Sequence, residues 1–253
     1  MKIVRYRQGD AVRTGIVEGD QVREVQGDVF SGGAATRKTL SLAHLKLLAP
    51  VDPSKIVAVG LNYREHAGEM GKALPAEPLL FLKPGTAVLD PEGVIQWPAM
   101  AGRVDYEGEL AVVIGKRTRN VTPAEARQCV LGYSVINDVT ARDLQVKDVQ
   151  FTRAKGFDTF APLGPWIVTD LDPADLALET RVNGQKRQSS STANLIFSPF
   201  ALVSFISRVM TLLPGDVIAT GTPAGIGPMQ PGDVVEISIA EIGTLKNTMG
   251  KKP

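Results

Sequence analysis

The sequence predicts an α+β protein that consists mostly of mixed β-sheet with a few helices. Short runs of β-branched residues recur along the 253 residues and are separated by turns that contain Gly, Pro or Asp. Clear helix starts are few, and the strands do not alternate regularly with helices, which argues against a series of β-α units. The length fits either one large domain or a small domain followed by a larger one.

We expect a small N-terminal β module over residues 1–52 and a larger catalytic domain over residues 53–253. In the first segment, short β-type runs alternate with turns at 8–10, 18–20 and 27–28, which predicts a meander. The module carries no recognisable chemistry, and His44 beside apolar neighbours is expected to be structural. Pro50 and Pro53 bracket the linker to the larger domain.

Two helix starts are clear in the larger domain. Thr122, Pro123 and Glu125 have the spacing of a capping box with proline in the first turn. Ser198 and Pro199 open a second helix. Its expected core stripe consists of Leu202, Phe205, Ile206, Val209 and Met210.

Composition and charge favour a small-molecule partner. The 28 Lys and Arg nearly balance the 27 Asp and Glu, so no broad field recruits nucleic acid or an anionic membrane. No apolar run approaches the roughly 20 residues of a spanning helix, no signal peptide is visible, and we expect a cytoplasmic protein. The single cysteine, Cys129, excludes an internal disulfide and is expected to pack in the core.

Segment 105–115 predicts a strand that places acidic side chains where a core is expected. With a side-chain period of two, Asp105, Glu107 and Glu109 share one face. Such a face must protonate, stay open to water or hold a cation, and Mg²⁺, Mn²⁺ or Ca²⁺ prefers carboxylate oxygens. Asp138 follows another β-rich run and is our third candidate ligand. The alternatives are a solvated edge strand, and a turn or helix cap at Asp138.

Four motifs occur in an order that resembles the fumarylacetoacetate hydrolase family over approximately residue 55 to the C-terminus. They are VDYEGEL (104–110), INDVTARDLQ (136–145), KGFDTFAPLGPW (155–166) and GDVIATGTPAGIG (215–227). The resemblance implies a mixed β-roll with a divalent metal near one mouth, and a homodimer through the catalytic domains. It favours Glu107, Glu109 and Asp138 as metal ligands. Larger members add a carboxylate ligand before the His, but segment 59–63 contains no acid.

The resemblance also assigns roles to side chains outside the acidic strand. Spacing alone leaves His66 and Glu69 as either a solvated pair or a general-base pair. The family stretch N-Y-x-x-H-x-x-E implies a proton-moving pair on a mobile lid, in which Gly68 and Gly71 would permit movement. It further implies that Arg142 and Gln145 bind substrate and that Lys155 is catalytic or adjoins the metal.

Two further side chains are judged from the sequence around them. The Gly-rich loop 221–227 lacks the Gly-Lys-Ser/Thr ending of a phosphate loop, so Thr222 is expected to donate its hydroxyl to another kind of ligand. Lys83 ends a β-type run and is equally compatible with a surface charge or a carboxylate clamp.

The expected activity is a Mg²⁺- or Mn²⁺-dependent reaction of a 2-oxo or 2-hydroxydienoic dicarboxylic acid through a metal-chelated enolate. The first candidate is a 2-hydroxyhepta-2,4-diene-1,7-dioate isomerase of the 5-oxopent-3-ene-1,2,5-tricarboxylate decarboxylase type, in aromatic catabolism. Acylpyruvate (fumarylpyruvate) hydrolysis and oxaloacetate decarboxylation are the enzymatic alternatives. A metal-stabilised ligand-binding scaffold is the non-enzymatic one.

Overall fold

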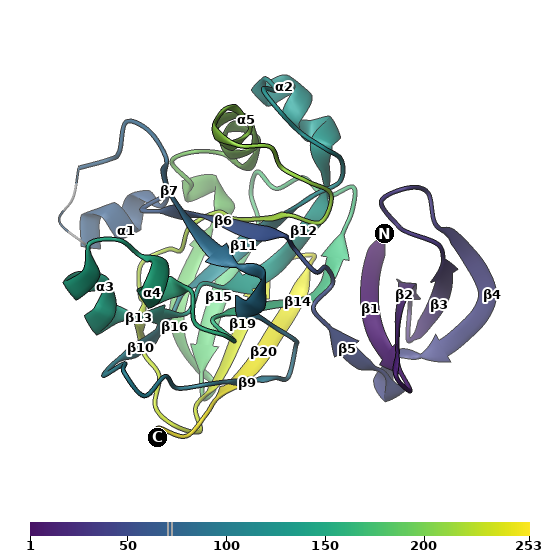
Figure 1. The fold of residues 1–253 in the computed structure, drawn as a ribbon, viewed down its shortest axis with the longest axis horizontal. Coiled ribbons are helices and arrows are strands. Elements are labelled where there is room, and N and C mark those ends of the chain that lie inside the picture. Colours follow the sequence, from purple (N-terminus) through teal and green to yellow (C-terminus); the bar gives the residue numbers. More distant parts are fainter. Residues whose placement is uncertain (70, 72) are drawn as a thin grey trace.

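The computed structural model describes residues 1–69, 71 and 73–253, and shows three β-sheets with short helices around them (Figure 1). The largest sheet has the order β4-β3-β2-β1-β14-β12-β11-β17-β6-β7, with β5 paired to β1 and β8 paired to β14. Parallel and antiparallel pairs occur together in it, since β6 and β17 run parallel while β11 and β12 run antiparallel. The predicted α+β class with mixed sheets is confirmed. Residues 70 and 72, which belong to the stretch expected to form a mobile lid with Gly68 and Gly71, lie outside the described residues.

The twelve strands of the largest sheet come from both parts of the chain. Its N-terminal strands are β1 (Lys2–Gln8), β2 (Ala11–Glu18), β3 (Gln21–Gln26), β4 (Ala34–Ser41) and β5 (Lys46–Leu48). The others are β6 (Lys55–Gly60), β7 (Leu79–Pro84), β8 (Val88–Leu89), β11 (Gly108–Ile114), β12 (Val130–Asn137), β14 (Ala161–Val168) and β17 (Val217–Ala219). The N-terminal strands form the expected meander and lie to one side of the molecule in Figure 1. They join the rest through β1, where Ile3 pairs with Ile167.

Two smaller sheets complete the architecture. The five-stranded sheet contains β9 (Val94–Ile95), β15 (Ala177–Val182), β16 (Gln185–Ser191), β19 (Val234–Ile239) and β20 (Gly243–Met249). The three-stranded sheet contains β10 (Val104–Tyr106), β13 (Thr140–Ala141) and β18 (Gly227–Pro228). The predicted strand over 105–115 is therefore two strands, because the chain leaves one sheet and enters another at Glu107.

The helices are short. They are α1 (Arg64–Glu69), α2 (Pro123–Ala126), α3 (Arg142–Asp148), α4 (Thr152–Lys155) and α5 (Pro199–Val209), with 3-10 turns at Leu42–His44, Gly85–Ala87, Arg127–Cys129 and Thr192–Asn194. In Figure 1, α1, α3 and α4 gather at one side of the sheets, and α2 lies beside α5. Ser198 caps α5 as predicted, and Leu202 and Ile206 are buried. The prediction that Val209 is core is wrong, because its side chain is 56% exposed at the last helical residue.

The predicted capping box at the start of α2 is confirmed and makes a testable contribution to stability. Thr122 Oγ1 accepts a hydrogen bond from the Glu125 amide, and Glu125 accepts one from the Thr122 amide. We expect Thr122→Ala to lower the free energy of unfolding by about 1 kcal/mol, because the capped amide loses its acceptor. Urea unfolding measures this change, with Thr86→Ala at an exposed 3-10 turn as the control. Equal midpoints for the two variants would contradict it.

Strand β11 is buried on both faces and carries the acidic residues into the interior. Leu110, Val112 and Ile114 pack in the larger core cluster together with side chains of the five-stranded sheet. Ala111 and Val113 point to the other face and pack with β6 and β17. Because side chains alternate along a strand, Glu109 shares the face of Ala111 and Val113.

Gly108 allows the two large sheets to approach next to the acidic residues. A Cβ atom at this position would lie 2.4 Å from Thr180 Oγ1 and 3.0 Å from a methyl carbon of Ile237. Any larger residue would therefore displace β15 and β19. The glycine between the two glutamates is thus required by packing on the face opposite their carboxylates.

Candidate functional site

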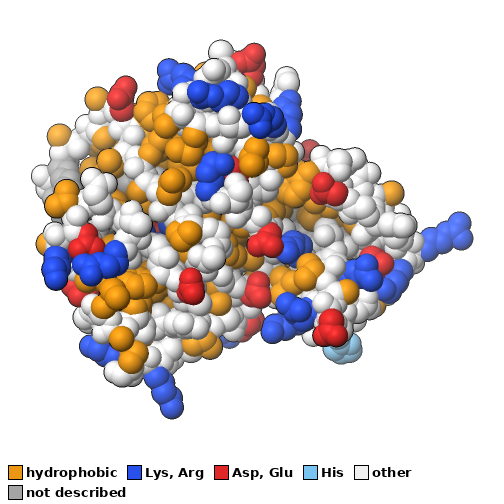
Figure 2. Space-filling model, viewed as in Figure 1, with side chains coloured by type: hydrophobic (Ala, Val, Ile, Leu, Met, Phe, Trp, Pro, Cys, Tyr) orange, Lys and Arg blue, Asp and Glu red, His pale blue; other side chains and the backbone are white. Residues whose placement is uncertain are grey.

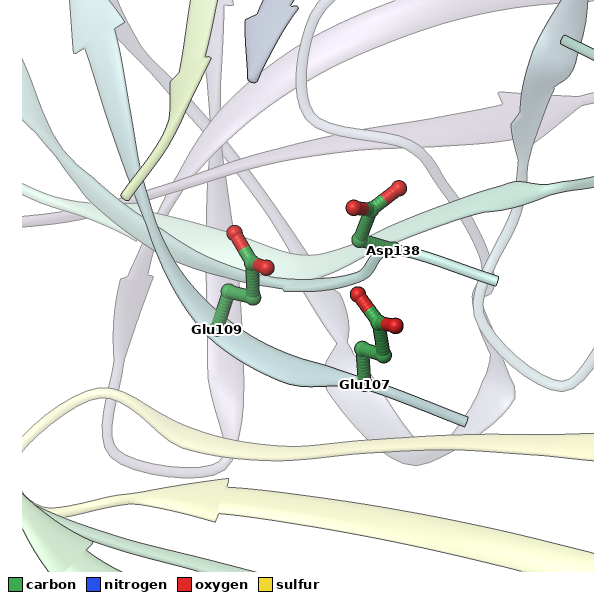
Figure 3. A group of neighbouring side chains, drawn as sticks. All are labelled: Glu107, Glu109 and Asp138. Carbon is green, nitrogen blue, oxygen red and sulfur yellow. The ribbon is translucent and has the colours of Figure 1, made fainter. Parts of the chain in front are cut away.

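Three buried carboxylates meet at one end of β11. Each of Glu107, Glu109 and Asp138 can offer an oxygen such that all three oxygens lie within 4.8 Å of one another. The three residues are at most 5% exposed. Figure 3 shows their side chains projecting toward a common space from β11 and from the end of β12. The structure therefore brings together the three proposed metal ligands, and the solvated-edge alternative is wrong.

Backbone hydrogen bonds fix these side chains relative to one another. The Asp138 amide donates to the Glu107 carbonyl at 2.9 Å, which extends the pairing of β11 with β12 by one residue. The side chain of Asn137 accepts a hydrogen bond from the Glu107 amide, also at 2.9 Å. Two candidate ligands that are distant in sequence are thus held by adjacent ends of paired strands.

The third carboxylate is held by the Gly-rich loop. The Gly221 amide donates to Glu109 Oε2 at 2.7 Å. Gly221 has a φ of +100°, and a Cβ atom there would lie 2.7 Å from the Cβ of Asn62. Asn62 in turn donates to the Thr220 carbonyl at 2.7 Å and accepts from the Phe197 amide. The loop therefore approaches the site through its backbone, as its glycines predict.

Two buried lysines donate hydrogen bonds to two of the carboxylates, although burial lowers the pKa of Lys83. Lys155 Nζ donates to Glu107 Oε2 at 2.8 Å and also to Asp138. Lys83 Nζ donates to Asp138 Oδ1 at 2.6 Å and to the Val139 carbonyl. Of the two roles left open for Lys83, the structure shows the carboxylate clamp.

Arg142 links the site to Asp105. It donates through Nε to Asp105 and through its two terminal nitrogens to Gln145 and Glu107. Asp105 also receives two hydrogen bonds from Arg103, so it balances arginines and is not one of the converging carboxylates. This corrects the expectation that Asp105 shares the environment of the two glutamates.

The carboxylates differ in their tendency to ionise. Burial opposes ionisation of Glu107, but Lys155 and Arg142 outweigh it and lower its pKa to about 2. Burial and repulsion from Asp138 and Glu107 raise the pKa of Glu109 well above its usual value. A divalent cation fits this donor set, because hard cations such as Mg²⁺ prefer carboxylate oxygens as ligands. Its positive charge would also offset the repulsion of Glu109 by Asp138 and Glu107.

The carboxylates line a cavity of about 260 Å³ together with five of the other proposed site residues. These are His66, Arg142, Gln145, Lys155 and Thr222. His66 Nδ1 lies 3.0 Å from Glu69 Oε2, and Glu69 Oε1 accepts a hydrogen bond from the Gly225 amide at 3.2 Å. His66 therefore faces the cavity, while Glu69, whose side chain is 40% exposed, connects the histidine to the Gly-rich loop.

Thr222 lines the cavity, but its hydroxyl already has partners. It donates to the Gly108 carbonyl at 3.0 Å and accepts from Gln188 Nε2 at 2.8 Å. Gln188 also accepts a hydrogen bond from the Gly108 amide at 3.0 Å. Its importance had no signal in the sequence, because it lies on β16, far along the chain from the acidic strand.

Comparisons with known proteins agree with this geometry. Residues 55–250 match the family described as fumarylacetoacetate (FAA) hydrolase C-terminal, and residues 1–50 match that described as Rv2993c-like, N-terminal. The chain belongs to the fumarylacetoacetate hydrolase family. Because members of this family are enzymes, the chain is an enzyme, and the scaffold alternative is wrong.

Relatives within the fumarylacetoacetate hydrolase family carry different activity names. A solved 2-hydroxyhepta-2,4-diene-1,7-dioate isomerase from Mycobacterium marinum is 47% identical, with a TM-score of 0.93 over 100% of this chain and 99% of that one. A 5-carboxymethyl-2-hydroxymuconate delta-isomerase from Mycobacterium smegmatis is 48% identical, with a TM-score of 0.94 over 100% of both chains. Oxaloacetate tautomerase YisK from Bacillus subtilis is 43% identical over 225 residues, which are 83% of this chain and 75% of that protein.

Surface features add two observations on partners. The face in Figure 2 mixes acidic and basic side chains without one large patch of a single sign. No helix among the described residues is both long and apolar enough to cross a membrane. The family acts on small molecules, which is consistent with a cavity of this size.

Proposed function

We propose that this protein is a divalent-metal-dependent enzyme that moves a proton on a 2-oxo acid, and that isomerisation or tautomerisation is its main reaction. One observation carries the proposal: three converging buried carboxylates face the same cavity as His66, whose ring is bonded to Glu69. The first group suits a hard cation, and the second suits proton transfer beside it.

The proposed ligands are Glu107, Glu109 and Asp138, and the proposed ion is Mg²⁺ or Mn²⁺, with Ca²⁺ as a further possibility. All three ligands offer oxygen, which these cations prefer. When bound, such a cation withdraws electrons from a chelated 2-oxo acid and so favours loss of a proton from the adjacent carbon. The protein side chains perform the remaining tasks.

His66 is proposed as the group that takes and returns the proton. Its Nδ1 is bonded to Glu69, which leaves Nε2 for exchange with a ligand in the cavity. Glu69 fixes the orientation of the ring. Arg142 and Gln145 are proposed to bind substrate oxygens, while Lys155 keeps Glu107 and Asp138 in place and adds positive charge beside the substrate.

The relatives support isomerisation and tautomerisation as first candidates. The Mycobacterium marinum protein is named an isomerase of a 2-hydroxydienedioate, and the Bacillus subtilis protein is named an oxaloacetate tautomerase. We retain hydrolysis of acylpyruvates as the second candidate, because a histidine oriented by a carboxylate can also deprotonate water. A role in aromatic catabolism, a cytoplasmic location and a homodimer complete the proposal.

An assay of one purified sample distinguishes these reactions. The substrates are 2-hydroxyhepta-2,4-diene-1,7-dioate, an acylpyruvate and the enol form of oxaloacetate, each with Mg²⁺, with Mn²⁺ and with a chelator. We expect metal-dependent loss of the enol chromophore that exceeds the release of pyruvate or CO₂. Release of pyruvate at the same rate would support hydrolysis instead. No turnover of any of them with either metal would refute the proposed function.

A further inference from the structure

The cavity above the carboxylates has an inner charged half and an outer apolar half. The inner half contains the acidic residues together with Arg142, Lys155 and His66. The outer half, as we define it, consists of Leu79, Phe81, Val146 and Phe151. These four side chains come from β7, from α3 and from the segment between α3 and α4.

An aromatic wall connects the two halves. Lys155 Nζ, which binds Glu107 and Asp138, lies 5.0 Å from the centre of the Phe81 ring. The Phe81 ring meets Phe151 edge to face, with ring centres 5.5 Å apart. A ligand that places its 2-oxo acid end at the carboxylates can therefore extend along two aromatic rings.

The outer half offers apolar surface to a ligand, and its four side chains cannot pair with a charged group on the ligand. Val146 is 81% exposed and Leu79 is 53% exposed, so a ligand tail would cover apolar surface that now faces water. Arg142 and Lys155, the Arg and Lys side chains among the described lining residues, are both bonded to carboxylates of the inner half. Among these described lining residues, a second carboxylate on the substrate would find no Arg or Lys that is free of a carboxylate partner, and it would cover less apolar surface than an alkyl or aryl group.

We propose that the outer half binds an uncharged alkyl or aryl group of the substrate and discriminates against a carboxylate at that distance from the 2-oxo acid end. This inference rests on the proposed function, because it assumes that the 2-oxo acid end lies at the carboxylates. It favours acylpyruvates with uncharged acyl groups, and short acids whose charges all stay in the inner half. It disfavours seven-carbon diacids, and so within the proposed function it ranks tautomerisation of a short 2-oxo acid such as oxaloacetate above isomerisation of 2-hydroxyhepta-2,4-diene-1,7-dioate.

Two compounds of equal length test the inference. In 2,4-dioxoheptanoate the seventh carbon is a methyl group, and in 2,4-dioxoheptanedioate it is a carboxylate. Both carry the same 2,4-dioxo acid end. We expect the Mg²⁺-loaded protein to bind the monoacid at least about tenfold more tightly by calorimetry, with a similar ratio in kcat/KM wherever turnover occurs.

A single added cation should reverse part of this preference. Val146→Lys places an ammonium group at the mouth, and the exposed helical position accepts lysine without repacking. We expect the variant to reduce the monoacid-to-diacid affinity ratio about two- to fivefold by improving diacid binding. Val209→Lys makes the same change at an exposed residue of α5, outside the cavity, and should leave the ratio unchanged.

The outcomes separate this inference from the proposed function. A monoacid-to-diacid ratio near one in the unchanged protein, or a ratio that favours the diacid, overturns the inference even if both compounds are turned over. An unchanged ratio in Val146→Lys also overturns it. Selective binding of the monoacid without turnover supports the outer half but counts against the enzymatic role. Failure of the Mg²⁺-loaded protein to bind either compound overturns both.

Discussion

Glu109→Gln is expected to lower divalent-cation affinity roughly 100-fold or more and to abolish turnover, while leaving the metal-free protein as stable as before. Removal of a direct ligand should exceed the 10–100-fold effects that are typical of groups behind the ligands. The metal-free protein tolerates the change because the raised pKa of Glu109 already favours its neutral form, which glutamine resembles. The Gly221 amide can still donate to the glutamine oxygen.

Glu107→Ala provides the contrast within the same site. It should also remove metal binding and every activity, but it should destabilise the metal-free protein by about 3–5 kcal/mol, because Lys155 and Arg142 lose a buried partner. Calorimetric titration with Mn²⁺ and urea unfolding without metal measure the two effects separately. Retention of metal affinity in either variant would contradict the proposed ligand set.

His66→Ala is expected to lower isomerisation or hydrolysis by roughly 10²–10⁴-fold while leaving metal affinity nearly unchanged. The histidine faces the cavity but is not among the converging carboxylates, so its removal deletes the proton acceptor and leaves the donor set for the cation intact. Decarboxylation of a β-keto acid should fall less, since it depends chiefly on electron withdrawal by the metal.

Glu69→Gln tests whether the histidine needs its carboxylate partner. It retains an oxygen that can accept from His66 Nδ1 or from the Gly225 amide but removes the charge. We therefore expect a smaller loss than in His66→Ala, together with a shift of the pH-rate profile. If His66→Ala retained full rates of isomerisation and hydrolysis, the base would have to be another group.

The sequence predicted the convergence of the three carboxylates because local rules position two of them. Glu107 and Glu109 are two residues apart and therefore share a face, even though the strand is interrupted at Glu107. Asp138 was predicted from its place after a β-rich run, and its convergence depends on the pairing of β11 with β12. The order of several family motifs supplied that non-local information.

Interactions that depend on tertiary structure alone could not be predicted. The burial of Lys83 follows from the packing of β7, and its partner Asp138 is 55 residues further along the chain. Gln188 supports Gly108 from the other large sheet, 80 residues away. Asp105 has the same two-residue spacing as the glutamates, but its carboxylate forms ion pairs with Arg103 and Arg142. The spacing alone does not predict these two contacts.

The buried side chains of Lys83 and Lys155 have a consequence for how the enzyme would acquire the proposed cation. These lysines pair with Asp138 and Glu107 in the metal-free protein. Folding should therefore not require a bound ion, in contrast to small zinc domains that are unfolded without metal. An incoming cation would meet carboxylates whose charge Lys155 already balances in part. Loading should therefore be reversible and should follow the free metal concentration of the surroundings, so that metal supply can set the fraction of active enzyme without changing how much folded protein is present.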